Sequence, residues 1–173
     1  TYSLIREPQI KHVSQLIGEH TRIFLYGFGS SGLAAQEFQL RLLRLGMDAE
    51  AITELHQMVL NEARITNACL VIGISLSGAT RELIDALDRA KARGAAVIYL
   101  TSSNAEREKR TYEEIVLAPV KKNLEYGNVI SPQFPILLIL DLIYAQLLKE
   151  DRRSTEAQYD THIWERIKDY HVG

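Results

Sequence analysis

Apolar residues along the chain form short unbroken runs that alternate with longer stretches at helical spacing. The runs at 68–74 and 95–100 are typical of strands covered on both faces of a sheet. A further strand is predicted at 22–26, with shorter strands at 49–53 and 114–117. These segments supply the strands of one sheet.

The stretches between the strands predict helices. Apolar residues recur at helical spacing over 31–45, around 55–60 and over 80–93. Gly46 and Gly94 stand where the first and the last of these helices are expected to end.

Three more helices are predicted outside this alternation. One ends near Gly18, one begins near Ser131, and one spans 155–170 and carries Trp164. The helix that begins near Ser131 is apolar on almost every side, so it must be covered on more than one side. A monomer of this size covers that helix only partly. We therefore expect one of its faces to form the interface of a homodimer, or of a tetramer.

Strands that alternate with helices in this way predict an α/β fold. The expected architecture is a three-layer α-β-α sandwich around a mostly parallel, doubly wound sheet. Residues 21–150 would form this domain. A linker-like helix would precede it in residues 1–20, and a peripheral helix would follow it in 151–173.

Composition and charge narrow the function. The chain has 173 residues, 46% of them hydrophobic, and a net charge of −2, which suits a single soluble domain and does not suit a surface that binds DNA or RNA. The single cysteine, Cys69, lies in an apolar run and predicts a buried, inert thiol. The histidines have no metal-ligand spacing, so neither a metal nor a cofactor is expected. The apolar segment 134–148 is too short to cross a membrane, and we expect a cytoplasmic protein.

Two loops that follow predicted strands carry the candidate chemistry. The first, at 27–32, reads GFGSSG and matches the G-x-G-x-x-G pattern of dinucleotide-binding turns. The second, at 73–80, reads GISLSGAT and places three hydroxyl side chains within six residues. Both loops lead into helices, and ligands of open parallel sheets bind at the carboxyl ends of the strands. Hydroxyls and helix N–H groups together can satisfy the oxygens of a phosphate without any lysine.

Three interpretations of these loops compete. Ser and Thr are common N-caps, so the hydroxyls could simply begin helices. A dinucleotide is also compatible, because Asp48 and Glu50 lie about 20 residues after the first loop, where such sites have an acidic residue. However, a dinucleotide leaves the second loop without a role. A small phosphorylated ligand held between both loops uses all the hydroxyls, and we favour it.

The predicted ligand-binding residues follow from this choice. The phosphate would be bound by Ser31, Ser75, Ser77 and Thr80. Further contacts are predicted for Gly29, Ser30, Leu76, Gly78, His56 and Glu125.

The ordered combination of motifs resembles the sugar isomerase (SIS) domain, whose members bind phosphorylated sugars. The first loop matches the Gly-x-Gly-x-Ser-Gly pattern of that family at Gly27, Gly29, Ser31 and Gly32. The second matches its Ser-x-Ser-Gly-x-Thr phosphate loop at Ser75, Ser77, Gly78 and Thr80. The stretch Val97–Ser102 resembles the next strand and its Thr-Ser end.

Within this superfamily the chain most resembles the effector domain of RpiR-type transcription regulators. The resemblance rests on Arg41–Gly46, on Leu55-His56-Gln57, and on the closing segment from Pro135 to Tyr144. It implies a domain that senses a sugar phosphate. In that family a separate N-terminal helix-turn-helix domain binds DNA, so DNA binding is expected only through a longer parent protein.

The alternative is a phosphosugar isomerase of the hexulose-phosphate type. Aldose–ketose isomerisation requires a base that moves a proton between neighbouring carbons. Glu125, in a polar loop where related isomerases place a glutamate, and His56 are the candidates. The closer resemblance to the regulators favours a sensor without catalytic residues, in which the ligand selects one arrangement of the dimer.

Overall fold

Five parallel strands form the centre of the molecule, in the order β2-β1-β3-β4-β5. The computed structural model describes residues 7–76, 80–103, 109–118 and 133–150. The strands are β1 (Arg22–Gly27), β2 (Ala49–Ile52), β3 (Cys69–Ser75), β4 (Ala96–Thr101) and β5 (Glu114–Leu117). The helices are α1 (Glu7–Glu19), α2 (Gly29–Arg44), α3 (Leu55–Asn61), the short 3₁₀ turn η2 (Glu62–Arg64), α4 (Arg81–Ala92) and α5 (Phe134–Glu150).

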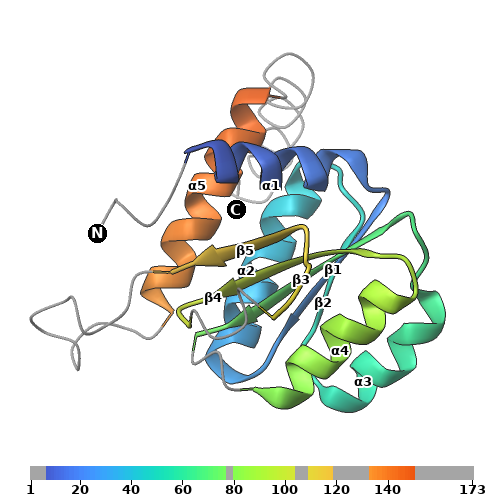
Figure 1. Cartoon of the computed structure of the whole chain (residues 1–173). Helices are drawn as coiled ribbons and strands as arrows, with labels where there is room; N and C mark the ends of the chain where they lie inside the picture. Colours follow the sequence, from blue (N-terminus) through green and yellow to red (C-terminus); the bar gives the residue numbers. More distant parts are fainter. Residues whose placement is uncertain (1–6, 77–79, 104–108, 119–132, 151–173) are drawn as a thin grey trace, which may run out of the picture.

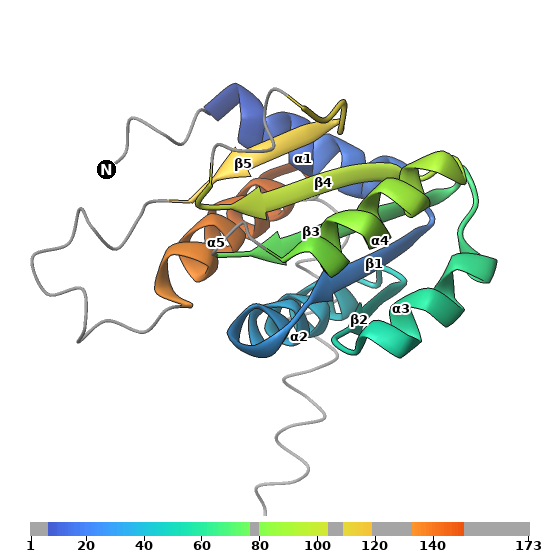
Figure 2. The same cartoon turned by 60° about the horizontal axis from the view of Figure 1, so that its bottom comes forward.

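The helices form one layer on each face of the sheet (Figures 1 and 2). Helices α1, α2 and α5 cover one face, and α3 and α4 cover the other. The three-layer sandwich expected from the sequence is therefore confirmed, and the described sheet is wholly parallel. In the described part of the chain no helix is long and apolar enough to cross a membrane.

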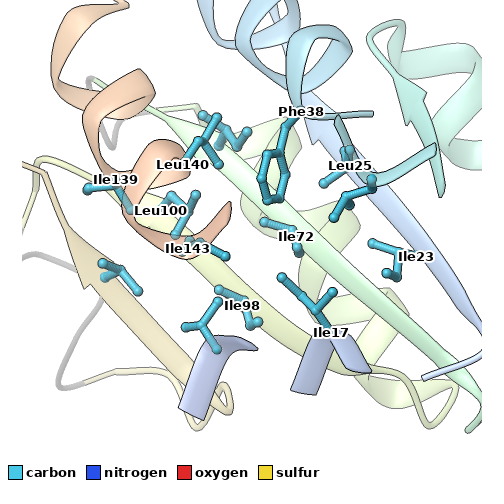
Figure 3. Close-up of a cluster of buried hydrophobic side chains, with 14 of the residues drawn as sticks. Ile17, Ile23, Leu25, Phe38, Ile72, Ile98, Leu100, Ile139, Leu140 and Ile143 are labelled. Carbon is cyan, nitrogen blue, oxygen red and sulfur yellow. The ribbon is translucent and has the colours of Figure 1, made fainter. Parts of the chain in front are cut away.

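Side chains of each strand alternate between two hydrophobic clusters. In β1, Ile23 and Leu25 join the cluster under α1, α2 and α5, whereas Phe24 and Tyr26 join the cluster under α3 and α4. Figure 3 shows the first cluster, where Phe38 of α2 and Ile143 of α5 meet the strands. Burial on both faces explains why the strands read as unbroken apolar runs. Cys69 is 2% exposed and lies in the second cluster, as predicted.

The predicted boundaries hold to within one residue for the strands. Helix α2 begins two residues earlier than predicted, at Gly29, whose φ of 53° lies in the left-handed region that glycine adopts without strain. Helix α5 is covered by α1, α2 and the sheet. Several of its leucines remain half-buried, and Phe134 is 50% exposed. The helix predicted at 155–170 lies outside the described residues.

Glutamine side chains bind the backbone at both edges of the sheet. At the β2 edge, Gln39 of α2 accepts a hydrogen bond from the Ala51 N–H at 2.5 Å. At the β5 edge, Gln9 of α1 donates to the Ile115 carbonyl at 2.9 Å and to Glu114 Oε2 at 2.8 Å. Occupied edge groups are unavailable to a strand of another chain, so these contacts protect the edges from aggregation.

Gly73 allows α4 to pack closely on β3. A Cβ atom at this position would lie 2.5 Å from Leu87 Cδ1, and Leu87 is fully buried. The close approach fixes α4 against the strand, and with it the loop that joins them.

We expect Gly73→Ala to lower the free energy of unfolding by about 1–3 kcal/mol, because the added methyl overpacks a site that cannot expand. Urea unfolding measures the change. Gly18→Ala is the matched control: Gly18 lies in α1 with no atom within 4 Å of an added Cβ. That substitution should leave the stability unchanged or raise it by up to about 1 kcal/mol. Equal losses in both variants would contradict the packing argument.

Candidate functional site

A hollow lies at the carboxyl ends of the neighbouring strands β1 and β3. Strands β1 and β3 are neighbours, and their register places Gly27 opposite Ile74. After β1 the chain enters α2 on one face, and after β3 it enters α4 on the other face. The two loops therefore separate at the carboxyl edge, and ligands of open α/β sheets bind at such switch points.

The hollow has a volume of about 250 Å³. Its described lining residues are Phe28, Ser30, Ser31, Ile74, Ser75, Leu76 and Thr80. The structure thus brings together Ser31, Ser75 and Thr80, three of the four residues predicted to bind phosphate. The fourth, Ser77, lies outside the described residues, as do Gly78 and Glu125.

The first loop turns tightly into α2. The N–H groups of Ser31 and Gly32 both bond to the Phe28 carbonyl, at 3.0 and 3.2 Å. A Cβ atom on Gly27 would lie 2.8 Å from the Ser31 carbonyl oxygen, so only glycine fits beside this turn. The turn buries Ser31 at the base of the hollow and places the first N–H groups of α2 beside it.

Thr80, in the second loop, does not act as an ordinary helix cap. Thr80 is the residue before α4, but its side chain makes no capping hydrogen bond. Its Oγ1 instead lies 3.4 Å from Ser75 Oγ, across the loop. The hydroxyl therefore faces the hollow and leaves the N-terminus of α4 uncapped by this side chain.

The end of β4 supports the second loop. Ser102 Oγ donates a hydrogen bond to the Leu76 carbonyl, and buried Thr101 accepts one from the Ser103 N–H at 3.1 Å. The sequence pattern included these residues in a Thr-Ser end but assigned them no role. A hydroxyl directly after the third buried strand was the signal that could have identified them.

His56 does not reach this hollow within one chain. It is exposed on α3, which covers the opposite face of the sheet from α2. Asp48 and Glu50, considered for a dinucleotide ribose, are paired with Arg22 at 3.0 Å and Arg64 at 2.8 Å. Neither carboxylate lines the hollow.

Sequence reasoning also missed the apolar part of the lining. Phe28 and Ile74 line the hollow, whereas Leu76 was the one apolar residue predicted there. No charged side chain occurs among the described lining residues. The favourable potential for an anion comes from the N-termini of α2 and α4, which both point toward this edge.

Beside the loop, burial raises the pKa of the Tyr26 phenol above its usual value. Its oxygen accepts a hydrogen bond from Asn61 Nδ2 at 2.8 Å, which partly offsets the effect of burial on the pKa. Tyr26 stays neutral at physiological pH and adds no charge near the hollow.

The topology and the hollow are those of a doubly wound α/β ligand-binding domain. More specifically, the family model for the SIS domain matches residues 15–136. The chain therefore belongs to the SIS domain family.

Relatives and solved structures agree with this assignment. An uncharacterised HTH-type transcriptional regulator of Haemophilus influenzae is 31% identical over 86% of this chain and 52% of its own length. The chain thus spans about half the length of this regulator. The sugar isomerase domain of an RpiR transcription factor from Sphaerobacter thermophilus has a TM-score of 0.76 at 18% identity, covering 96% of this chain and 88% of that one.

Two further solved structures share the fold. NanR of Vibrio vulnificus, complexed with ManNAc-6P, has a TM-score of 0.76 at 22% identity and covers 95% of this chain and 61% of that one. A Methanococcus jannaschii protein with the inferred function of a 3-hexulose-6-phosphate isomerase has a TM-score of 0.67 at 20% identity, covering 84% and 79%. The shared fold thus occurs in an RpiR transcription factor and in a protein inferred to be an enzyme.

We expect Thr80→Ala to change the free energy of unfolding by less than about 0.5 kcal/mol, because Thr80 does not cap α4. Loss of a true Ser or Thr cap typically costs about 1 kcal/mol. Chemical denaturation followed by circular dichroism measures the difference. A loss of about 1 kcal/mol or more would show that the hydroxyl caps the helix in solution.

Proposed function

We propose that this chain is the effector domain of a bacterial transcription regulator and senses a phosphorylated sugar. The observation that carries the proposal is the meeting of Ser31, Ser75 and Thr80, from two separate loops, around one hollow. Ser77 would complete the phosphate site. DNA binding belongs to a helix-turn-helix domain of a longer parent protein, acting in the cytoplasm.

The chemistry of the hollow suits a phosphate. Phosphate oxygens accept hydrogen bonds, and each hydroxyl can donate one. The N-termini of two helices add N–H groups and a favourable dipole. Further contacts come from Ser30 and from the backbone of Gly29, Leu76 and Gly78. Phe28 and Ile74 exclude water from one side, which strengthens these hydrogen bonds.

The lining supports binding over catalysis. An isomerase needs a base within reach of the substrate carbons. Among the described lining residues none is a carboxylate or a histidine. The relationship to HTH-type regulators supports the same choice.

We also propose that the chain acts as a homodimer, or a tetramer, that encloses the sugar. Leu55 and His56 begin α3 and Phe134 begins α5, all on the side of the sheet where the strands end. Leu55 is 40% exposed and Phe134 is 50% exposed. A second copy covering these side chains would bring a histidine toward the sugar hydroxyls, with Glu125 as a further contact. The ligand then favours one arrangement of the two chains, and that change reorients α1 and the DNA-binding domains.

Calorimetry with a panel of sugar phosphates tests the phosphate site. Ser75→Ala and Thr80→Ala should each weaken binding by about tenfold or more, because each loses a hydrogen bond to a charged group. Thr21→Ala is the control, because Thr21 is exposed and directly precedes β1, at the end of the strand away from the hollow. This variant should bind the sugar phosphate like the wild type. The unphosphorylated sugar should bind far more weakly. Equal binding of the two sugar forms would show that the phosphate assignment is wrong.

An isomerase is the second candidate, favoured by the likeness to the Methanococcus jannaschii protein. Incubation with ketose and aldose phosphates, followed by product detection, separates the two functions. We expect no turnover by the wild type. Turnover that disappears in Glu125→Gln would instead identify Glu125 as a catalytic base and contradict a domain that only senses.

A further inference from the structure

A second pocket lies at the β2 edge of the sheet, on the face that α3 and α4 cover. It has a volume of about 300 Å³, at the lower end of the range for small-molecule sites. Residues of β2, α3 and η2 line it: Glu50, Ile52, Gln57, Leu60, Asn61 and Arg64. None of these six residues lines the hollow between the two hydroxyl-rich loops. The pocket is therefore separate from the proposed phosphate site.

Asn61, the last residue of α3, brings an unused hydrogen-bond acceptor to this pocket. The residue is 3% exposed, and its Nδ2 donates to Tyr26 Oη at 2.8 Å. No described residue donates a hydrogen bond to its buried Oδ1. A buried amide oxygen without a partner is unfavourable, and a single ordered water would fill only a small part of the pocket. This arrangement favours a ligand that brings a donor to Asn61.

The two charged residues of the lining are paired with each other. Arg64 Nη1 donates to Glu50 Oε2 at 2.8 Å, and Arg64 Cζ lies 5.1 Å from the centroid of the Phe24 ring. These contacts hold the guanidinium in place, and the opposite charges leave the lining without a net charge. An ionic ligand would be attracted by one partner and repelled by the other, so an uncharged ligand fits this pocket better.

The polar groups of the lining include donors as well as acceptors. The Gln57 carboxamide has both, and Arg64 has further N–H groups beyond the one that Glu50 accepts. Carboxamide and guanidinium groups form paired hydrogen bonds with the edges of planar bases. Ile52, buried at the end of β2, and Leu60, which is 62% exposed, add apolar surface for the ring of such a ligand.

We propose that this pocket binds a small uncharged ligand through an amide edge, in which an N–H donor stands next to a carbonyl acceptor. The N–H donates to Asn61 Oδ1, and the carbonyl accepts from Gln57 or Arg64. Nucleobases and small cyclic amides both carry such an edge. The proposal does not depend on the phosphate site, because the two sites share no described lining residue.

Two pairs of compounds test the amide edge. Uracil and 2-pyrrolidone carry the N–H, whereas 1,3-dimethyluracil and N-methyl-2-pyrrolidone lack it. In ¹H–¹⁵N spectra of the full chain, the first two should shift the backbone resonances of β2, α3 and η2 and leave those of Ser31 and Thr80 in place. Each methylated compound should bind about tenfold more weakly than its parent, because Asn61 Oδ1 stays unpaired. The parent that binds more tightly distinguishes a nucleobase from a cyclic amide.

Three results of this titration would overturn the proposal. The first is no shift with either parent compound. The second is equal binding of a parent and its methylated form, because the donor to Asn61 would then be irrelevant. The third is a set of shifts centred on Ser31 and Thr80, which would place the compound in the other hollow.

Substitutions locate the contact independently. Gln57→Ala should weaken binding of the tighter parent compound by about threefold or more, and Asn61→Ala by about tenfold. Because Asn61 also bonds to Tyr26, circular dichroism checks that the second variant is folded. Gln36→Ala is the matched control, since Gln36 is an exposed glutamine on α2, across the sheet, and should bind like the wild type. Equal losses in Gln57→Ala and Gln36→Ala would overturn the assignment to this pocket.

Discussion

The parallel pairing of β1 with β3 is the constraint on which the rest of the structure depends. These neighbours are separated in sequence by α2, β2, α3 and η2, and β2 lies on the other side of β1, so the chain must cross from one side of β1 to the other. Their side chains are buried on both faces, and a shift of one residue would exchange Ile23 and Leu25 with Phe24 and Tyr26 between clusters. Hydrophobic packing thus fixes the register, and the register fixes which loop residues meet.

The same pairing explains how a hollow whose described lining residues carry no charge can suit an anion. Helices α2 and α4 leave the edge on opposite faces, and their N-termini converge on the space between the loops. Fixed dipoles and hydroxyls offer directed hydrogen bonds that do not depend on pH near neutrality. A lysine would offer a stronger but less directional attraction. Under the proposed function, such a site would distinguish a phosphate by geometry as well as by charge.

Close contacts at two glycines fix the positions of the strand ends that lead into the loops. The Ser31 carbonyl approaches Gly27, and Leu87 approaches Gly73, so each loop is held by a position that has no room for a side chain. Ser102 holds the Leu76 carbonyl from the neighbouring strand. Ser31 and Ser75 therefore lie next to positions that are held against the sheet, which limits the ordering of these two residues that a bound ligand would require.

The sequence by itself determined the class of fold and most of the proposed site. Unbroken apolar runs identified the buried strands, and the hydroxyls at 31, 75 and 80 were predicted from their place after those runs. Local pattern could not show that Thr80 faces Ser75 and does not cap α4, because both arrangements use the same residue at the same position. Nor could it place Phe28 and Ile74 at the hollow, show that Ser102 bonds to the Leu76 carbonyl, or show that His56 lies on the other face. Those facts depend on strand order and helix direction, which arise from contacts between residues far apart in the chain. Only the tertiary structure decided them.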